Sequence, residues 1–219
     1  MDPDKLLVKV SLGKKLTAAE MEDVIHALTK IDPQAMGRAG LVDEAYSLLH
    51  LLGRAKVFHC IQLLEKYLES KDPLTVALVL EILCFDWGRS EGYIERVIDF
   101  ALGVSWDLEE DVRQTAIKIL GEYLRGRFES ANSKSNDTLP EDIQIVPGGD
   151  KTKHVLELLF GILSDQELGQ ATRQGAYFAL CRAGGKEWTE LPSECAVLNL
   201  ERDSPDLDWA MLAKLAPAQ

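Results

Sequence analysis

The sequence lacks the short signatures by which nucleotide-binding and hydrolytic proteins are recognised. It contains no GxGxxG, no GxxxxGK[ST], no GxSxG and no HExxH. A glycine-rich loop for phosphates, an exposed catalytic serine and a zinc-binding helix are therefore not indicated. No other set of residues forms a catalytic constellation, so we expect a protein that is not an enzyme and needs no cofactor.

Long apolar runs and strand-like alternation are missing as well. No run approaches the roughly 20 residues that cross a bilayer. The N-terminus MDPDKLLVKV is too acidic, and its apolar part too short, for a secretory signal. Regular Val/Ile/Thr alternation is absent, which argues against a β-sandwich. We expect a cytoplasmic protein that does not bind membranes.

Basic residues are fewer than acidic residues in this sequence. The 219 residues include 24 Lys and Arg against 36 Asp and Glu, which gives a net charge of −12. This charge disfavours direct binding to nucleic acid or to an anionic membrane, and it favours a basic protein partner. A surface that is acidic only for solubility explains the same numbers. The 46% hydrophobic content is ample for a core.

The four cysteines show no metal-binding or disulfide pattern. Cys60, Cys84, Cys181 and Cys195 are scattered without a CxxC pair, and the first three lie in apolar helical contexts. Small buried thiols are the interpretation that this pattern favours. None of the four histidines precedes a glutamate, and no metal site is expected.

One stretch, residues 107–123, carries the clearest helical pattern. Apolar residues recur there at the spacing of one helix face, namely Val112, Ala116, Ile119, Leu120, Tyr123 and Leu124. Asp107 is a good N-cap, and Glu110 three residues later completes a capping box. The small Ala116 lies in the middle of the stripe, where a neighbouring helix could approach closely.

The same pattern returns 60 residues later. Arg113 is matched by Arg173, and an acid stands six residues before each arginine, Asp107 in one case and Glu167 in the other. Residues 107–123 therefore resemble the first helix of a HEAT repeat. In that family the matched acid and arginine help hold successive repeats together, which is the structural role that the resemblance implies for these four residues.

The remaining helices are expected at comparable intervals. Val42, Val76 and Val112 mark three first helices 34 and 36 residues apart. Asp2-Pro3, Thr17 with Glu20, Asp72-Pro73, Ser90 and Ser204-Pro205 are caps for further helices. Residues 127–150, rich in Ser, Asn, Asp, Pro and Gly, are expected as an inserted loop.

The whole chain is thus expected to be all-α, as one domain over residues 1–219. The repeat resemblance implies an α-solenoid of about five antiparallel helical hairpins with one inserted loop at 127–150. Helical repeats stack because a single hairpin cannot bury its own apolar face. We expect a monomer.

An acidic stripe on one second helix is the candidate partner-binding surface. Glu91, Glu95 and Asp99 recur at i, i+4 and i+8 without an interleaved base, while Leu102 is placed in the apolar stripe of that helix. Every tryptophan adjoins an acid, and Trp87 is the best candidate for exposure. The candidate site comprises Asp86, Trp87, Glu91, Glu95, Asp99, Trp106 and Glu157. Tryptophans that plug seams between hairpins, and a merely solvated acidic face, remain alternatives.

The leading functional hypothesis is a protein-binding inhibitor. An acidic, compact helical-repeat protein without chemistry of its own looks like bacterial immunity proteins, some of which are HEAT-like and neutralise a basic nuclease. The resemblance implies that the acidic stripe covers the cleft of such a toxin. The alternative is a HEAT scaffold within a larger complex, which is less favoured because helix caps lie near both ends of the chain. A third is a repeat-containing lyase with a large apolar cavity for a chromophore.

Overall fold

The segments with apolar residues at helical spacing form helices along the described part of the chain. The computed structural model describes residues 2–35, 41–132, 150–193 and 196–216, and these contain ten α-helices and no strand. The all-α prediction is confirmed. Contacts divide the chain into two compact units, Met1–Ala116 and Ile117–Gln219, so the single domain over 1–219 remains a prediction.

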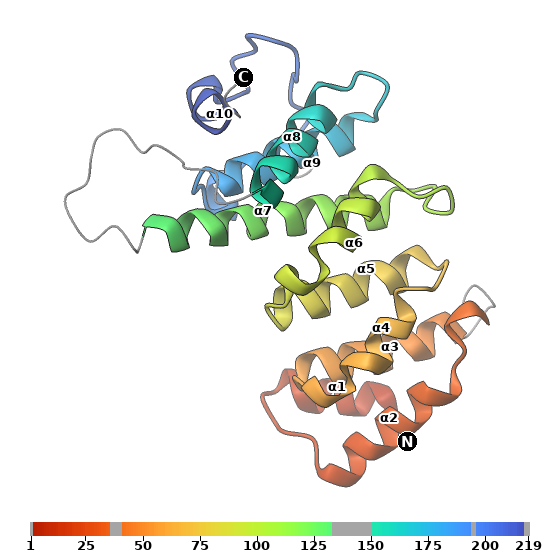
Figure 1. Cartoon of the computed structure of the whole chain (residues 1–219). Coiled ribbons are helices and arrows are strands. Elements are labelled where there is room, and N and C mark those ends of the chain that lie inside the picture. The colour runs from red at the N-terminus through yellow and green to blue at the C-terminus, as the bar shows by residue number, and fades with distance from the viewer. Residues whose placement is uncertain (1, 36–40, 133–149, 194–195, 217–219) are drawn as a thin grey trace. The chain divides into compact units, whose positions relative to one another are not determined.

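The first unit contains six helices and the start of a seventh. They are α1 (Pro3–Ser11), α2 (Ala18–Lys30), α3 (Leu41–Arg54), α4 (Ile61–Tyr67), α5 (Pro73–Glu81) and α6 (Ser90–Leu102). Short 3-10 turns occupy Pro33–Ala35 and Phe58–Cys60, and a π-helical turn, η3, continues α5 over Ile82–Asp86. The helix α3 lies against α1, α2 and α5 (Figure 1).

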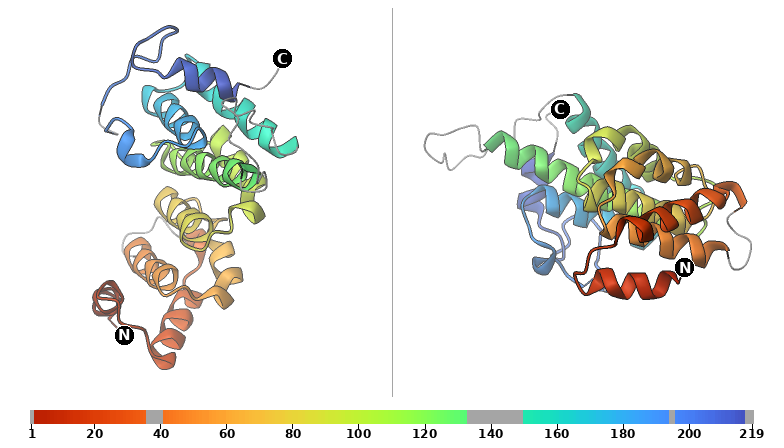
Figure 2. Two further views of the ribbon diagram at one scale, coloured as in Figure 1. Left: turned by 90° about the vertical axis from the view of Figure 1, so that its left-hand side faces the viewer. Right: turned by 90° about the horizontal axis from the view of Figure 1, so that it is seen from below.

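The second unit begins within α7 (Asp111–Asn132). It also contains α8 (Asp150–Ser164), α9 (Gln170–Ala183), a 3-10 turn at Trp188–Glu190 and α10 (Trp209–Leu215). The helix α9 is its centre, because almost every residue from Thr172 to Ala183 is buried and both α8 and α10 lie against it (Figure 2).

Several predicted helix starts are confirmed by their caps. The Asp2 side chain accepts the Lys5 N–H, and the Asp72 side chain accepts the Thr75 N–H. Thr17 and Glu20 form the predicted capping box. Lys9 Nζ also reaches a Glu20 carboxylate oxygen at 2.6 Å, and the hydrogen bonds from Lys9 and Thr17 together lower the pKa of Glu20 to about 2.

The start and end of α7 differ from the prediction. The helix begins at Asp111, because Glu110 adopts a left-handed φ of 59°. Asp107 still serves the helix start from the preceding turn, where its Oδ2 accepts the Arg113 N–H at 3.1 Å. The capping box with Glu110 is wrong, since Glu110 instead accepts a 2.9 Å hydrogen bond from Arg113 Nη1.

The expected loop over 127–150 is wrong for its first six residues. The helix α7 continues to Asn132, since Phe128 is buried and Arg125 forms an i, i+4 ion pair with Glu129 at 2.7 Å. The helix α8 already begins at Asp150. The remainder of that expected loop, residues 133–149, lies outside the described residues.

Two predicted serine caps are wrong. Arg89 holds the N-cap position of α6, because its carbonyl accepts the Gly92 N–H at 3.0 Å, and Ser90 is the first helical residue. Ser204 belongs to a turn in which its Oγ accepts the Asp206 N–H. Asp208 caps α10 instead, by accepting the Met211 N–H at 3.0 Å.

Long side chains from later elements satisfy the carbonyls that helix ends leave open. Tyr67 Oη donates to Leu28 O at 2.7 Å, near the end of α2, and Arg96 Nη2 donates to Leu68 O at 2.8 Å, at the end of α4. Helix ends need such partners because their last carbonyls have no donor within the helix. These bonds connect helices that are far apart in the sequence.

The two repeated arginines make the same contact. Arg113 Nε donates to Ala101 O and Arg173 Nε donates to Leu163 O, each at 3.0 Å. Each acceptor is the penultimate residue of the helix before, α6 in one case and α8 in the other. Of the matched acids, Asp107 is buried and contacts the Arg113 backbone, whereas Glu167 is exposed.

A close approach of α7 and α9 occurs at Gly121. A Cβ on Gly121 would lie 2.7 Å from Ala179 Cα and 2.9 Å from Ala179 O. Both are backbone atoms of α9, so the two helices would have to move apart. Gly126, five residues along the same helix, has nothing within 4 Å of such a Cβ.

We therefore expect opposite effects from the same substitution at these two glycines. Gly121→Ala should lower the free energy of unfolding by about 1–3 kcal/mol through overpacking. Gly126→Ala should raise it by about 0.5–1 kcal/mol, because alanine favours an exposed helix interior. Urea unfolding followed by circular dichroism measures both, and equal effects would contradict the close contact at Gly121.

Candidate functional site

The acidic stripe on α6 is exposed as predicted. Glu91, Glu95 and Asp99 are all exposed, while Ile94 and Val97 pack into the core from the other side of the helix. The spacing at i, i+4 and i+8 turns the three carboxylates to one face. This helix therefore presents three acidic groups along roughly two turns.

The stripe ends in apolar surface that the sequence interpretation placed in the core. Leu102 falls on the same helix face, three residues after Asp99, and is 59% exposed. Leu108, in the turn that follows, is 87% exposed. The assignment of Leu102 to the buried stripe is wrong, because α6 ends at that residue and Gly103 leaves the helix with a φ of 96°.

Polar contacts to α4 hold α6 in place. Tyr93 Oη donates to Glu65 Oε1 at 2.7 Å, and Arg96 Nη1 pairs with Glu69 at 2.7 Å. Arg96 also lies over the Phe100 ring, 5.5 Å from its centroid. The stripe is thus carried by a helix that is fixed by hydrogen bonds as well as by its buried face.

Trp87 is not exposed, contrary to the prediction. Its ring is 8% exposed and packs edge-on against Phe58, with centroids 5.2 Å apart. Its Nε1 donates to Gly53 O at 3.1 Å, at the end of α3. The π-helical turn before it brings the ring back toward α3, since the Trp87 N–H bonds to Ile82 O. The tryptophan thus fills a seam between helices and offers no exposed anchor.

The other candidate residues are spread over both units. Asp86 is exposed at the end of η3, and Trp106 is half-buried with its ring 6.3 Å from that of Phe100. Glu157 is exposed on α8 in the second unit, where Lys153 lies 3.7 Å away. The first unit therefore carries Asp86, Trp106 and the three acids of α6 by itself.

Two tryptophans that the candidate site omitted are more exposed. Trp188 is 39% exposed and lies against the Arg182 guanidinium, 5.2 Å from ring centroid to Cζ. Trp209 is 38% exposed, and its Nε1 donates to Ser204 O at 2.9 Å. Each adjoins an acid in the sequence, as Trp87 does, so the local sequence carried no signal that separates buried from exposed tryptophans.

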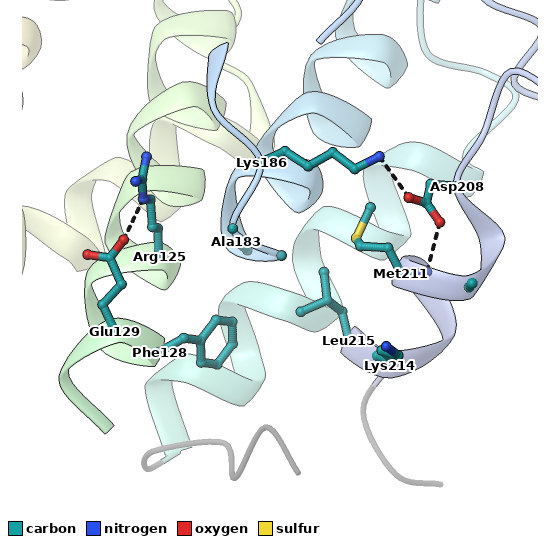
Figure 3. A pocket seen from close by; sticks show the side chains of 12 residues that line it. Arg125, Phe128, Glu129, Ala183, Lys186, Asp208, Met211, Lys214 and Leu215 are labelled. Carbon is teal, nitrogen blue, oxygen red and sulfur yellow. Dashed lines mark hydrogen bonds and ion pairs between the residues drawn. The ribbon is translucent and has the colours of Figure 1, made fainter. Parts of the chain in front are cut away.

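A pocket of about 550 Å³ lies in the second unit beside α10. Phe128, Met211 and Leu215 extend toward the same space, with Lys186 and Asp208 at its margin (Figure 3). Gly184 permits the close approach of α10, since a Cβ there would meet Met211 Cγ at 2.8 Å. The lining is mainly apolar, and Lys186 is paired with Asp208 at 2.7 Å.

The described residues offer little for metal or thiol chemistry. They contain no group of three or more His, Cys, Asp or Glu side chains placed to hold a metal ion. Cys60, Cys84 and Cys181 are buried and free, as predicted, whereas Cys195 lies outside the described residues. Burial raises the pKa of the Cys84 thiol to about 12, so this thiol stays protonated.

Comparison with known proteins adds no relative. Neither a protein-family model, nor a curated protein, nor a solved structure matches this chain. Within the described residues, no helix has both the length and the apolar character that a bilayer crossing requires.

We expect Asp208 to control the docking of α10. Its carboxylate caps the helix and pairs with Lys186, and its N–H donates to Tyr177 Oη at 3.0 Å. Asp208→Ala should cost about 1 kcal/mol through the lost cap. Hydrogen exchange should accelerate over Trp209–Leu215, whereas the exposed control Glu201→Ala should leave it unchanged. Unchanged exchange in Asp208→Ala would contradict this role.

The same contact should depend on pH. The hydrogen bond from Lys186 holds the pKa of Asp208 below its ordinary value of 3.8. A carboxyl with a lowered pKa stabilises the fold fully above its ordinary pKa and loses that effect as the pH falls through the lowered value. The difference in exchange over α10 between the unsubstituted protein and Asp208→Ala, compared at the same pH, should therefore disappear only below about pH 4.

Proposed function

We propose that this chain is a non-enzymatic, protein-binding inhibitor that occupies a basic partner in the cytoplasm. The observation that carries the proposal is the exposed face of α6, where three carboxylates run into the exposed Leu102. Carboxylates steer a cationic partner toward the surface, and an adjoining apolar side chain adds contact area that water leaves on binding.

The proposed architecture is a stack of about five antiparallel helical hairpins of HEAT-like type. The matched contacts of Arg113 and Arg173 with the penultimate carbonyl of the preceding helix support it. A structural repeat requires equivalent contacts between each helix and the helix before it, and these two arginines make such contacts through the same atoms. The resemblance to immunity proteins then suggests a nuclease-like toxin as the partner, with its cationic cleft covered by α6.

In this proposal the partner contacts the acidic stripe, with Asp86 and Trp106 in the same unit. Trp87 has no part, because its ring and Nε1 are engaged in the core. The net charge of the whole chain, −12, speeds encounter with a cation over longer distances. Association should consequently slow as salt increases.

Charge reversal on α6 tests the proposal. The protein is used as bait in lysate of its host, and the captured partner is then purified for binding measurements. Glu95→Lys with Asp99→Lys should raise the dissociation constant about tenfold or more, because like charges would face each other. Glu22→Lys with Asp23→Lys is the matched control, since it reverses two exposed acids on α2 in the same unit.

Growth assays identify the class of partner. A captured basic protein that stops growth alone, is neutralised by the unsubstituted chain and escapes the α6 double variant would support the inhibitor. Equal affinity for both double variants would exclude α6 as the binding surface. Recovery of several subunits of one stable assembly, insensitive to the α6 change, would favour the alternative of a scaffold.

A further inference from the structure

A second pocket, in the first unit, has the opposite charge to the rest of the chain. It measures about 420 Å³ and lies where the end of α1, the start of α2 and the end of α3 meet. Four of its lining residues are cations, Lys14, Lys15, Arg54 and Lys56, and no described carboxylate lines it. Such a concentration of positive charge is unexpected in a protein with a net charge of −12.

The acid in the first turn of α2, Glu20, already has partners. Glu20 accepts hydrogen bonds from Lys9 Nζ, at 2.6 and 2.8 Å, and from the Thr17 N–H at 2.7 Å. This carboxylate is thus neutralised by its own lysine and by the start of the helix. Among the described residues, no carboxylate forms an ion pair with any of these four cations, and Arg54 is bonded to a neutral hydroxyl, Ser11 Oγ, at 2.8 Å.

Helix ends account for only part of this charge. Lysines near the C-termini of α1 and α3 complement the negative ends of the helix dipoles, which is an ordinary stabilising role. Each helix end carries roughly half a negative charge, so two ends offset about one of the four cations. The positive end of α2 adjoins the same pocket through Leu16 and Met21. A clear positive excess remains.

One cation is held at a position where glycine is preferred. Lys56 has a φ of 52°, and its N–H bonds to Gly53 O while the next N–H, of Val57, bonds to Leu52 O. This is the Schellman ending, in which a left-handed residue closes the helix. The equivalent residue after α1 is Gly13, with a φ of 73°. A lysine at position 56, where glycine would be relaxed, strains the backbone and places a cation at the pocket.

The pocket joins this charge to apolar surface. Val10, Leu16 and Met21 line it together with the four cations. Arginine and lysine are the residues that bind phosphate oxygens, and an apolar wall accommodates an organic group. Its volume falls within the range of small-molecule sites. We propose that this pocket binds a small organic molecule that carries phosphate groups, independently of the inhibitor function proposed above.

Titration of the full chain with inorganic pyrophosphate tests the assignment. Calorimetry at low ionic strength should show saturable binding at one site. Arg54→Gln with Lys56→Gln should weaken it about tenfold or more, because charge-assisted hydrogen bonds are lost. Lys66→Gln with Lys71→Gln, which removes two exposed cations elsewhere in the same unit, is the matched control and should stay within about twofold.

Lys56→Gly gives a second test in which the fold is not at risk. Glycine relaxes the left-handed backbone, so the melting temperature should rise by about 1–3 °C while pyrophosphate binds more weakly. A gain in stability with a loss of binding is the result expected of a residue retained for a ligand. No saturable binding to the unsubstituted chain, or equal binding by the Arg54/Lys56 variant and its control, would overturn the proposal.

Discussion

The packing of these helices is governed by the open carbonyls at helix ends. In an all-helical arrangement no neighbouring strand donates hydrogen bonds to these carbonyls, so each must accept one from a side chain, a turn or water. Here Tyr67, Trp87, Arg96, Arg113 and Arg173 each donate to a carbonyl at the end of an earlier helix. Because a side chain reaches across to its acceptor, every such bond also fixes the distance between two helices.

The use of arginine side chains as interior donors affects the charge of the surface. Arg173 and Arg182 are buried and Arg113 is engaged by a carbonyl and a carboxylate, so part of the scarce positive charge serves the interior. Many of the acids, by contrast, lie in exposed positions, as on α6. The resulting acidic surface gives the proposed partner site its character. The basic pocket near Lys56 differs because its cations lie at two helix ends and no described carboxylate lines it.

The candidate site could be anticipated in part. Spacing alone placed Glu91, Glu95 and Asp99 on one exposed face, since periodicity is a local property of a helix. The prediction that Trp87 is exposed was wrong, because the burial of a turn residue depends on the residues that pack against it, here Gly53 and Phe58. Sequence spacing also could not predict the basic pocket, because its cations come from two segments some 40 residues apart.

The helical class, most helix positions and the equivalence of Arg113 with Arg173 could be predicted from local sequence, because caps and apolar periodicity act within a few residues of one another. Local sequence did not predict three features, which are the end of α7 at Asn132, the start of α10 at Trp209 and the close contact at Gly121. At each of these places a contact with a distant segment, or a turn closed by its own hydrogen bonds, outweighs the local preference for a cap or a loop.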